Sequence, residues 1–296
     1  MPTCHREGYD VKIAEAVRKH MPVNGISMSC LEWAGPGDPA RCSVLLLHGV
    51  LQNAEGMTAL ARHLSNHHRV VVPDLRGRGE TDQPEDGYDP STMSRDVAEL
   101  IGSLGLERLV VIGRNHGGVV GYHLAADSPN LVRGLILSDA NPDVGPERAA
   151  RRLASVGELP RSFPDLDTAI RYYQERLGVS EERARHDIPH DLLESGGVYT
   201  WRHNLDVIAR IEQASAPRTD WDVLARILAP TLLLRGQWSR IPKATAEQAR
   251  RTIPRVELQM IFGAGHDVFL GNGAEQALGA IDMFLMRLNR LETGSR

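Results

Sequence analysis

An asparagine lies between two glycines at a point where the chain is expected to turn from a strand into a helix. The segment reads Ile112-Gly113-Arg114-Asn115-His116-Gly117-Gly118. Glycines permit close packing of the backbone, and asparagine tolerates a positive φ better than most residues. A carboxamide donates and accepts hydrogen bonds, but it is neither a deprotonatable hydroxyl nor a carboxylate. The segment predicts a sharp turn that presents a hydrogen-bonding side chain, and this side chain cannot act as a nucleophile.

The elements that would position this turn are short apolar runs alternating with helical patterns. Residues 25–33 alternate like a half-exposed edge strand, and six apolar runs are typical of buried strands. The expected buried strands are 43–47, 69–72, 109–112, 135–137, 231–234 and 256–261. The expected helices are 55–64, 91–104, 118–126 and 275–291. This order predicts an α/β fold with a mostly parallel central sheet flanked by helices.

The pattern changes between residues 141 and 228, where Arg/Glu-rich helical stretches are interrupted by prolines and no convincing strand is found. We expect a helical cap inserted at 141–228 into a core formed by residues 1–140 and 229–296. A chain of 296 residues is suited to one core with such an insertion.

Four segments, taken together, resemble the α/β-hydrolase superfamily over about residues 25–290. They are Leu47-His48-Gly49, Pro73-Asp74-Leu75-Arg76-Gly77-Arg78-Gly79, the turn at 113–117, and Gly263-Ala264-Gly265-His266-Asp267. The resemblance implies an α/β-hydrolase fold with a cap, in which Asn115 replaces the nucleophilic serine of the strand-to-helix turn.

The resemblance also implies roles for other residues. His266 lies in the loop where the family keeps its general base. The backbone N–H groups of Val50 or Leu51, together with that of His116, correspond to the family's oxyanion hole, which the change to Asn115 need not remove.

The acid that would orient His266 is ambiguous. The family usually has an aspartate at or beside Ser239, where this chain has Ser239-Arg240. Some members place the acid after the preceding strand, and Asp139 follows the expected strand 135–137. In one interpretation Asp139 holds His266 and raises its basicity; in the other it caps or packs the start of the cap.

Four further residues have roles that the sequence leaves open. The His116 side chain either lines the first turn of the helix or adds a titratable group to the pocket. Arg76 and Arg78 are expected to fix their loop through ion pairs and not to contact substrate. Trp201, in the aromatic segment 199–204, is a candidate for lining the pocket from the cap.

Asn115 leaves four functions open. In the first, His266 activates water to hydrolyse an activated ester, lactone or β-dicarbonyl compound, with Asn115 as a non-covalent hydrogen-bonding group. In the second, His266 abstracts a substrate proton in a lyase, cyclase or cofactor-independent oxygenase. In the third, Asn115 stands for the nucleophilic aspartate of dehalogenases and epoxide hydrolases. In the fourth, the chain is an inactive small-molecule binder.

Composition limits the partners. The net charge of −4 provides no basic field for nucleic acid, so we expect a small-molecule substrate, with no cofactor or metal and with the oligomeric state open. No apolar run resembles a signal peptide or a membrane span, which favours a cytoplasmic protein. Cys4, Cys30 and Cys42 are expected to be reduced thiols in or near the core.

Overall fold

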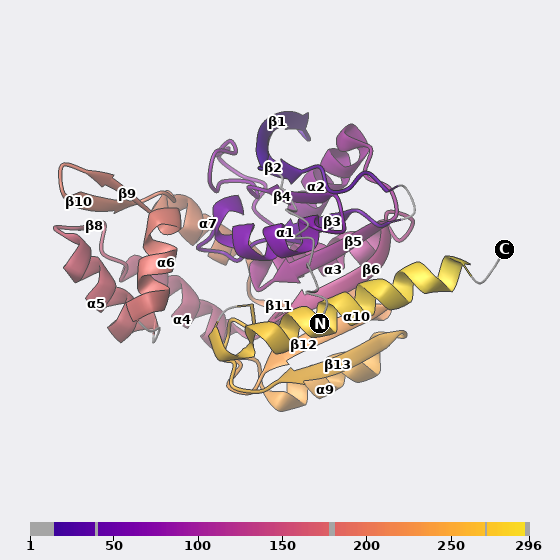
Figure 1. Ribbon diagram of the computed structural model, residues 1–296. Coiled ribbons are helices and arrows are strands. Elements are labelled where there is room, and N and C mark those ends of the chain that lie inside the picture. The colour runs from indigo at the N-terminus through magenta and orange to yellow at the C-terminus, as the bar shows by residue number, and fades with distance from the viewer. Residues whose placement is uncertain (1–14, 39–40, 178–180, 270, 294–296) are drawn as a thin grey trace, which may run out of the picture.

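Eight strands form the central sheet of the computed structural model, which describes residues 15–38, 41–177, 181–269 and 271–293 (Figure 1). Their spatial order is β1 (Val17–Val23), β2 (Ile26–Trp33), β4 (Val70–Pro73), β3 (Val44–Leu47), β5 (Leu109–Arg114), β6 (Val132–Ser138), β12 (Thr231–Gly236) and β13 (Val256–Ile261). All neighbours from β4 to β13 are parallel, whereas β2 is antiparallel to both β1 and β4. The predicted, mostly parallel sheet is confirmed.

The strand β1 was not predicted from the sequence. It pairs with β2 along its whole length, and Pro22 lies opposite Ser27. Its sequence, VRKHMPV, has three consecutive basic residues and a proline, and most of its side chains are exposed or half-buried. An edge strand can tolerate proline and charge because one side makes no ladder hydrogen bonds. This composition removes the apolar pattern by which strands are recognised in a sequence.

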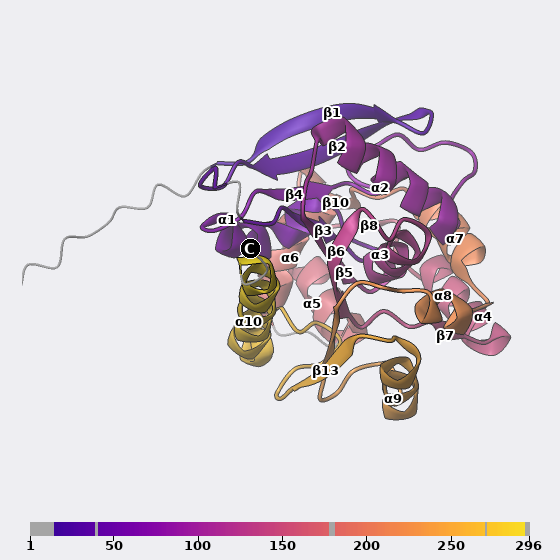
Figure 2. The ribbon, with the colours of Figure 1, turned by 90° about the vertical axis from the view of Figure 1, so that its right-hand side faces the viewer.

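Helices cover both faces of the sheet, as Figure 2 shows. One face packs against α1 (Thr58–Ser65) and α10 (Ala274–Thr293). The other packs against α2 (Pro90–Leu104), α3 (His116–Asp127) and α9 (Lys243–Thr252). Short 3₁₀ turns at Ala54–Met57 and Gly271–Gly273 precede α1 and α10.

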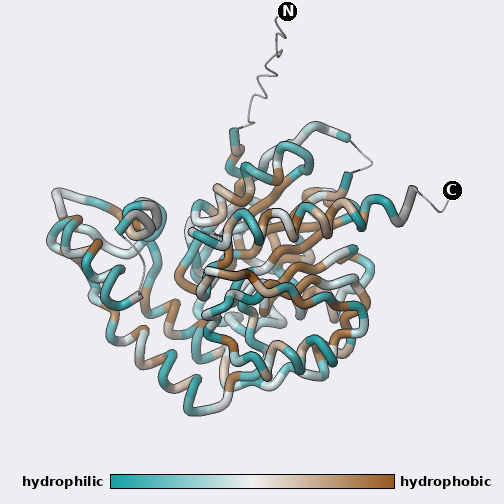
Figure 3. Tube along the Cα trace, turned by 60° about the horizontal axis from the view of Figure 1, so that its bottom comes forward, coloured by the Kyte–Doolittle hydropathy of each residue, from teal (hydrophilic) through white to brown (hydrophobic). Residues whose placement is uncertain are grey.

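The strand β3 illustrates why the sheet lies between two layers. Leu45 and Leu47 belong to one apolar cluster, while Val44 and Leu46 belong to the cluster on the opposite face. Successive side chains of a strand point to opposite faces, so a continuously apolar strand must be covered on both. Figure 3 shows the same concentration of apolar residues in the strands.

The insertion that we expected to form a cap, and call the cap below, lies between β6 and β12 and projects to one side of the sheet (Figure 1). Its elements are β7 (Asp143–Val144), α4 (Pro146–Gly157), β8 (Ser162–Phe163), α5 (Leu166–Leu177), α6 (Glu181–Asp191), β9 (Leu192–Ser195), β10 (Val198–Trp201), α7 (Leu205–Ser215), β11 (Arg218–Thr219) and α8 (Trp221–Ala225). The expectation of no strand was wrong, because β8, β10 and β9 form one small sheet and β11 pairs with β7. Strands of two to four residues are too short for a recognisable alternation.

Within the described part of the chain, no helix has the length and apolarity required to span a bilayer. Cys30 and Cys42 are buried free thiols, as predicted, and Cys4 lies outside the described residues. Burial raises the pKa of the Cys30 thiol to about 11. Such a thiol stays protonated at neutral pH, which fits the expectation of an inert core cysteine.

Candidate active site

Asn115 forms the turn between β5 and α3, with φ 52° and ψ −116°. Side chains rarely adopt a positive φ, and the prediction that asparagine would accommodate it here is confirmed. A Cβ atom at Gly113 would lie 2.5 Å from Gly118 Cα, and one at Gly117 would lie 2.2 Å from the carbonyl oxygen of Leu47. Both glycines are therefore needed for strand and helix to pack this closely.

His266 lies after β13 and contacts residues at the ends of two other strands. Its Nδ1 donates to Oδ2 of Asp139, which follows β6, and its Nε2 lies 3.4 Å from Asn115 Nδ2. An ionised carboxylate only accepts hydrogen bonds, so the imidazole proton belongs on Nδ1. The lone pair of Nε2 then faces the Asn115 carboxamide. The structure places the three predicted catalytic residues in one cluster.

Ser239 supports the carboxylate of Asp139. The Ser239 hydroxyl donates to Asp139 Oδ1, and its oxygen accepts the backbone N–H of Ile241 at 3.0 Å. Asp139 itself is 6% exposed and has φ 52°. Both carboxylate oxygens are thus engaged by side chains, one by Ser239 and one by His266. The residue at the family's usual acid position holds the acid that comes from the preceding strand.

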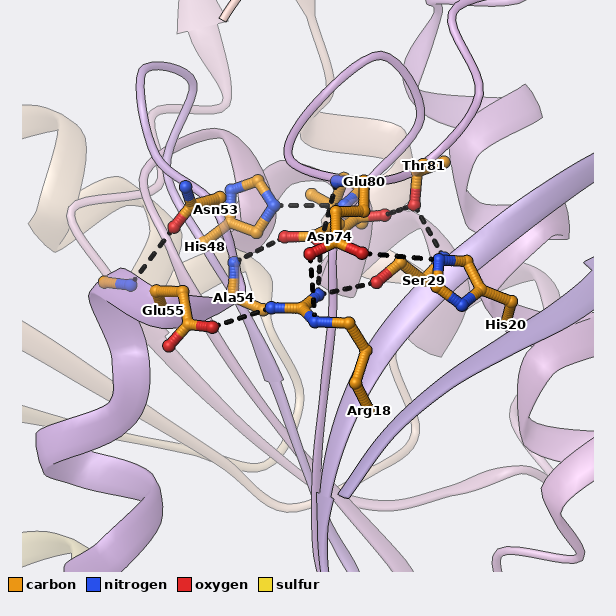
Figure 4. A network of polar contacts seen from close by, with 12 residues as sticks. Arg18, His20, Ser29, His48, Asn53, Ala54, Glu55, Asp74, Glu80 and Thr81 are labelled. Carbon is orange, nitrogen blue, oxygen red and sulfur yellow. Dashed lines mark hydrogen bonds and ion pairs between the residues drawn. The ribbon is translucent and has the colours of Figure 1, made fainter. Parts of the chain in front are cut away.

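A buried carboxylate, Asp74, fixes the loop that carries Val50 and Leu51 (Figure 4). Asp74 Oδ1 accepts the backbone N–H of Ala54 at 2.7 Å, and Oδ2 lies 3.1 Å from Arg18 Nη1. Burial raises the pKa of Asp74, although these hydrogen bonds and the Arg18 charge oppose the rise. The network joins β1, the loop after β3 and the loop after β4. It therefore holds in place the loop after β3, which carries the backbone N–H groups of Val50 and Leu51.

His48 belongs to this framework as well. Its Nδ1 donates to the carbonyl oxygen of Gly49 at 2.8 Å, and its Nε2 accepts the backbone N–H of Leu75 at 3.0 Å. Complete burial lowers the pKa of His48 well below its ordinary value. A neutral imidazole donates one hydrogen bond and accepts another, so it pairs with a backbone group of the loop after β3 and with one of the loop after β4. This positioning role was not recognised in the sequence.

His116 begins α3 and is 2% exposed. Its Nε2 lies 3.2 Å from Met93 Sδ, and the residue contributes to the lining of the pocket described below. Burial, followed by the nearby Arg78 charge, lowers the pKa of His116 well below its ordinary value, so the ring is neutral at physiological pH. Its backbone N–H is the first of the helix and has no intrahelical acceptor.

A pocket of about 120 Å³ opens beside Asn115 and His266. Pockets for drug-sized ligands are typically ~300–1,000 Å³, so this one fits a smaller molecule. It is lined by Asn115, His116, Val119, Asp139, Asn141, Arg148, Arg152, Arg218, Arg240, Ile241 and His266.

Trp201 is not part of this lining, and the expectation that it faces the pocket is corrected. It packs in the cap against Phe163 and Tyr173, with ring centroids 5.8 and 6.1 Å away. Its Nε1 donates to the carbonyl oxygen of Pro160 at 2.7 Å. The cap has an apolar core of its own, and an indole with a backbone acceptor is well suited to it.

The two arginines of the loop after β4 differ from each other. Arg76 forms the expected ion pair, with Nε 2.7 Å from Asp96 Oδ2. Arg78 does not: it is fully buried, and within the described residues its Nε and Nη1 have no hydrogen-bond partner. Burial lowers the pKa of Arg78 to about 9. The ion-pair prediction is confirmed for Arg76 and wrong for Arg78.

Sequence reasoning missed Asn141 and the four arginines of the pocket. Arg148 and Arg152 are four residues apart and share one face of α4. In the sequence they belong to an Arg/Glu-rich stretch that reads equally well as a solvated cap helix. Only the packing of α4 over the ends of the strands distinguishes the two. Across the described residues no group of three or more His, Cys, Asp or Glu is arranged to hold a metal ion.

Comparison with known proteins finds relatives that are named as a lipase and a hydrolase. The chain is 27% identical over 266 residues to the sn-1-specific diacylglycerol lipase ABHD11 of Mus musculus, covering 84% of this chain and 82% of that protein. It is 26% identical over 230 residues to the 2-(acetamidomethylene)succinate hydrolase of Mesorhizobium japonicum, covering 76% and 81%.

Solved structures agree with the sequence relatives. The structure is similar to that of an alpha/beta hydrolase from Novosphingobium aromaticivorans, with a TM-score of 0.78, 28% identity, and coverage of 93% of this chain and 99% of the other. Residues 43–273 match the sequence profile of the alpha/beta hydrolase fold. The chain therefore belongs to the α/β-hydrolase-fold family.

Proposed function

We propose that the protein hydrolyses a small carbonyl compound, an activated ester, a lactone or a β-dicarbonyl, by direct attack of water. The observation that carries this proposal is the convergence of Asn115, His266 and Asp139 on one small pocket. His266 lines the pocket, its Nε2 lies beside Asn115, and its ring is held at Nδ1 by the carboxylate of Asp139. This is the arrangement a general base requires.

In the proposed reaction Nε2 of His266 removes a proton from water, and the water oxygen forms a bond to the carbonyl carbon. The carbonyl π electrons move to oxygen, and backbone N–H groups of His116 and of Val50 or Leu51 stabilise the oxyanion. When the tetrahedral intermediate collapses, the bond to the leaving group breaks. The protonated His266 returns its proton to that group, so no covalent bond to the protein forms.

Asn115 has a specific place in this scheme. Its Oδ1 is buried and has no partner among the described residues, although its Nδ2 lies beside His266. A water molecule placed between them would donate one O–H to Asn115 Oδ1 and the other to His266 Nε2. The carboxamide would then orient the water whose proton the imidazole removes.

The relatives support hydrolysis over other carbonyl chemistry. The mouse relative is named as a lipase and the Mesorhizobium relative as a hydrolase. Proton abstraction from the substrate by the same His266 is the main alternative, since an unprotonated Nε2 serves either purpose. The aspartate-like covalent route requires deamidation of Asn115, and an inactive binder requires no turnover at all.

A single-turnover experiment in H₂¹⁸O tests the proposal, with 4-nitrophenyl acetate as the probe. We expect one ¹⁸O atom in the released acetate and no mass increase on the protein. His266→Ala should lower kcat by about 10²–10⁴-fold, the usual contribution of general-base catalysis. Asn115→Ala should retain more activity than His266→Ala because it only orients water.

Four results would overturn direct attack by water. A covalent adduct at residue 115, which with this probe would be a mixed anhydride of a deamidated side chain, would establish the aspartate-like route. Full activity of His266→Ala would remove the base. Binding without any product, for this probe and for a panel of lactones and β-dicarbonyls, would favour the inactive binder. Turnover of a β-dicarbonyl without ¹⁸O incorporation would indicate lyase or oxygenase chemistry.

A further inference from the structure

The pocket beside His266 carries an excess of positive charge. Four arginines, Arg148, Arg152, Arg218 and Arg240, line it together with a single carboxylate, Asp139. That carboxylate is already engaged by His266 and Ser239. A pocket for a neutral ester has no need of this positive charge. The partners of each arginine therefore decide which of them are available to a ligand.

Two of the four arginines are neutralised by the protein. Arg152 Nη2 lies 2.9 Å from the carboxylate of Glu212, and Arg218 Nε lies 3.2 Å from that of Asp220. Arg218 Nη2 also donates to the carbonyl oxygen of Asn141 at 2.7 Å. These contacts give Arg152 and Arg218 a structural role at the base of the cap.

Arg148 and Arg240 have no carboxylate partner among the described residues. Arg148 Nη2 donates to the carbonyl oxygen of Arg240 at 3.1 Å, which brings the start of α4 and the loop after β12 together. Burial, followed by the charge of Arg152, lowers the pKa of Arg148. The two residues supply guanidinium donors that the protein does not use for an ion pair.

Asn141 provides an independent observation that points to a ligand. It is 8% exposed and lines the same pocket. Its Oδ1 accepts the backbone N–H of Asp143 at 3.1 Å, and this hydrogen bond fixes the orientation of the carboxamide. The remaining polar atom of the side chain is the donor Nδ2. Within the described residues this buried Nδ2 has no hydrogen-bond partner. A buried donor without an acceptor is unfavourable unless a ligand or water supplies one.

We propose that the substrate carries a carboxylate apart from its reacting carbonyl, and that Arg148, Arg240 and Asn141 bind this carboxylate. A planar guanidinium matches the two oxygens of a carboxylate, and the carboxamide adds a neutral donor. The small pocket volume suits a short acid whose reacting carbonyl then lies toward Asn115 and His266. The inference rests on the proposed function for the position of the reacting carbonyl. Binding of the carboxylate to the three residues can be measured without any reaction.

The test measures binding without turnover. Succinate is titrated into the protein by calorimetry, with its dimethyl ester as the neutral probe and inorganic phosphate as a second anion. We expect saturable binding of succinate, at least tenfold weaker binding of the dimethyl ester, and weaker binding of phosphate. The double variant Arg148→Gln/Arg240→Gln should weaken succinate binding at least tenfold.

Two further variants make the result specific. Asn141→Asp keeps the size of the side chain and turns the donor into a repelling charge, so succinate binding should be lost. Arg151→Gln removes an exposed charge from the same helix but outside the pocket lining and should change the affinity less than twofold. Thermal unfolding of each variant verifies that it is folded.

Equal binding of succinate and its dimethyl ester would overturn the carboxylate site, as would unchanged succinate binding in the double variant. Phosphate bound more tightly than succinate would replace the carboxylate by a phosphoryl group and overturn the inference as stated. These results are separate from the ¹⁸O experiment. Loss of hydrolysis with retained succinate binding would count against the proposed reaction alone.

Discussion

The guanidinium of Arg114 and the carboxylate of Asp267 lie 3.1 Å apart, and these two residues are the sequence neighbours of Asn115 and His266. Both side chains are largely buried, at 10% and 14% exposure. One ion pair therefore joins the turn after β5 to the loop after β13. The two loops belong to strands separated in the sheet by β6 and β12, so the pair fixes how Asn115 and His266 face each other.

Asp267→Asn should lower kcat about tenfold or more, because a small misplacement of His266 relative to Asn115 disturbs the path of the proton. It should also destabilise the fold by on the order of 3 kcal/mol, since Arg114 would remain buried without its counter-charge. Urea unfolding and steady-state kinetics check both effects. The control is Arg287→Gln, which breaks an exposed pair with Glu257 and should cost below about 1 kcal/mol. Unchanged kcat in a folded Asp267→Asn protein would show that the pair does not position the site.

The contact between Asp139 and His266 leads to a graded prediction. Asp139→Asn should lower kcat by about 10²–10⁴-fold, because an amide would no longer fix the Nδ1 tautomer or stabilise the charged imidazole. Ser239→Ala should have a smaller effect, about tenfold or less, since it removes only a hydrogen bond to the carboxylate. Stopped-flow or steady-state rates with the same activated ester for both variants show which of them loses more kcat. A larger loss in Ser239→Ala than in Asp139→Asn would contradict the assignment of Asp139 as the orienting acid.

Elements set by neighbouring residues could be predicted from the sequence, whereas contacts between distant residues could not. The buried strands were predicted because their apolar runs are continuous, and the turn at Asn115 because its glycines encode close backbone packing. Asp139 was left open because its partner His266 lies 127 residues away, and no pattern in one sequence measures that separation in space. The edge strand β1 and the short cap strands lack the alternation that marks longer strands.

The pocket arginines and Trp201 show a second limit. An arginine on α4 has the same sequence pattern whether it faces solvent or the pocket, and an aromatic residue in the cap reads the same in an apolar core as in a binding site. Which applies is decided by how the cap packs on the strand ends. The cap is joined to the core by long-range contacts that the periodicity of a single helix does not contain.

Asn115→Ser should restore a reactive nucleophile. The turn, the His266 base and the Asp139 carboxylate are already present, so a hydroxyl at position 115 would lie near Nε2. We expect a fluorophosphonate probe to label Asn115→Ser and leave the natural protein unlabelled, as measured by intact mass. The double variant Asn115→Ser/His266→Ala is the control and should lose the label. Labelling of the natural protein at another site of the pocket would contradict the water mechanism.

The stability of the fold should fall as the pH is lowered below about 6.5, because buried histidines are held neutral. Burial, followed by the Arg78 charge, lowers the pKa of His203 to about 4, and burial also lowers the pKa values of His48 and His116. In the unfolded chain a histidine titrates near 6.5, so between pH 6.5 and 4 the unfolded state binds more protons. The stabilisation is complete above pH 6.5 and is lost as the pH falls through this window.

For His203 alone the loss amounts to roughly 3 kcal/mol across the window, from 1.36 kcal/mol per pKa unit. Urea unfolding at a series of pH values measures it. His203→Asn should flatten the dependence between pH 6.5 and 4, whereas His67→Asn, at an exposed position, should leave it unchanged. The same slope in His203→Asn and the natural protein would mean that His203 is not the group that binds the proton on unfolding. In that case His48, His68 and His116, whose pKa values are also lowered by burial, would have to account for the whole effect.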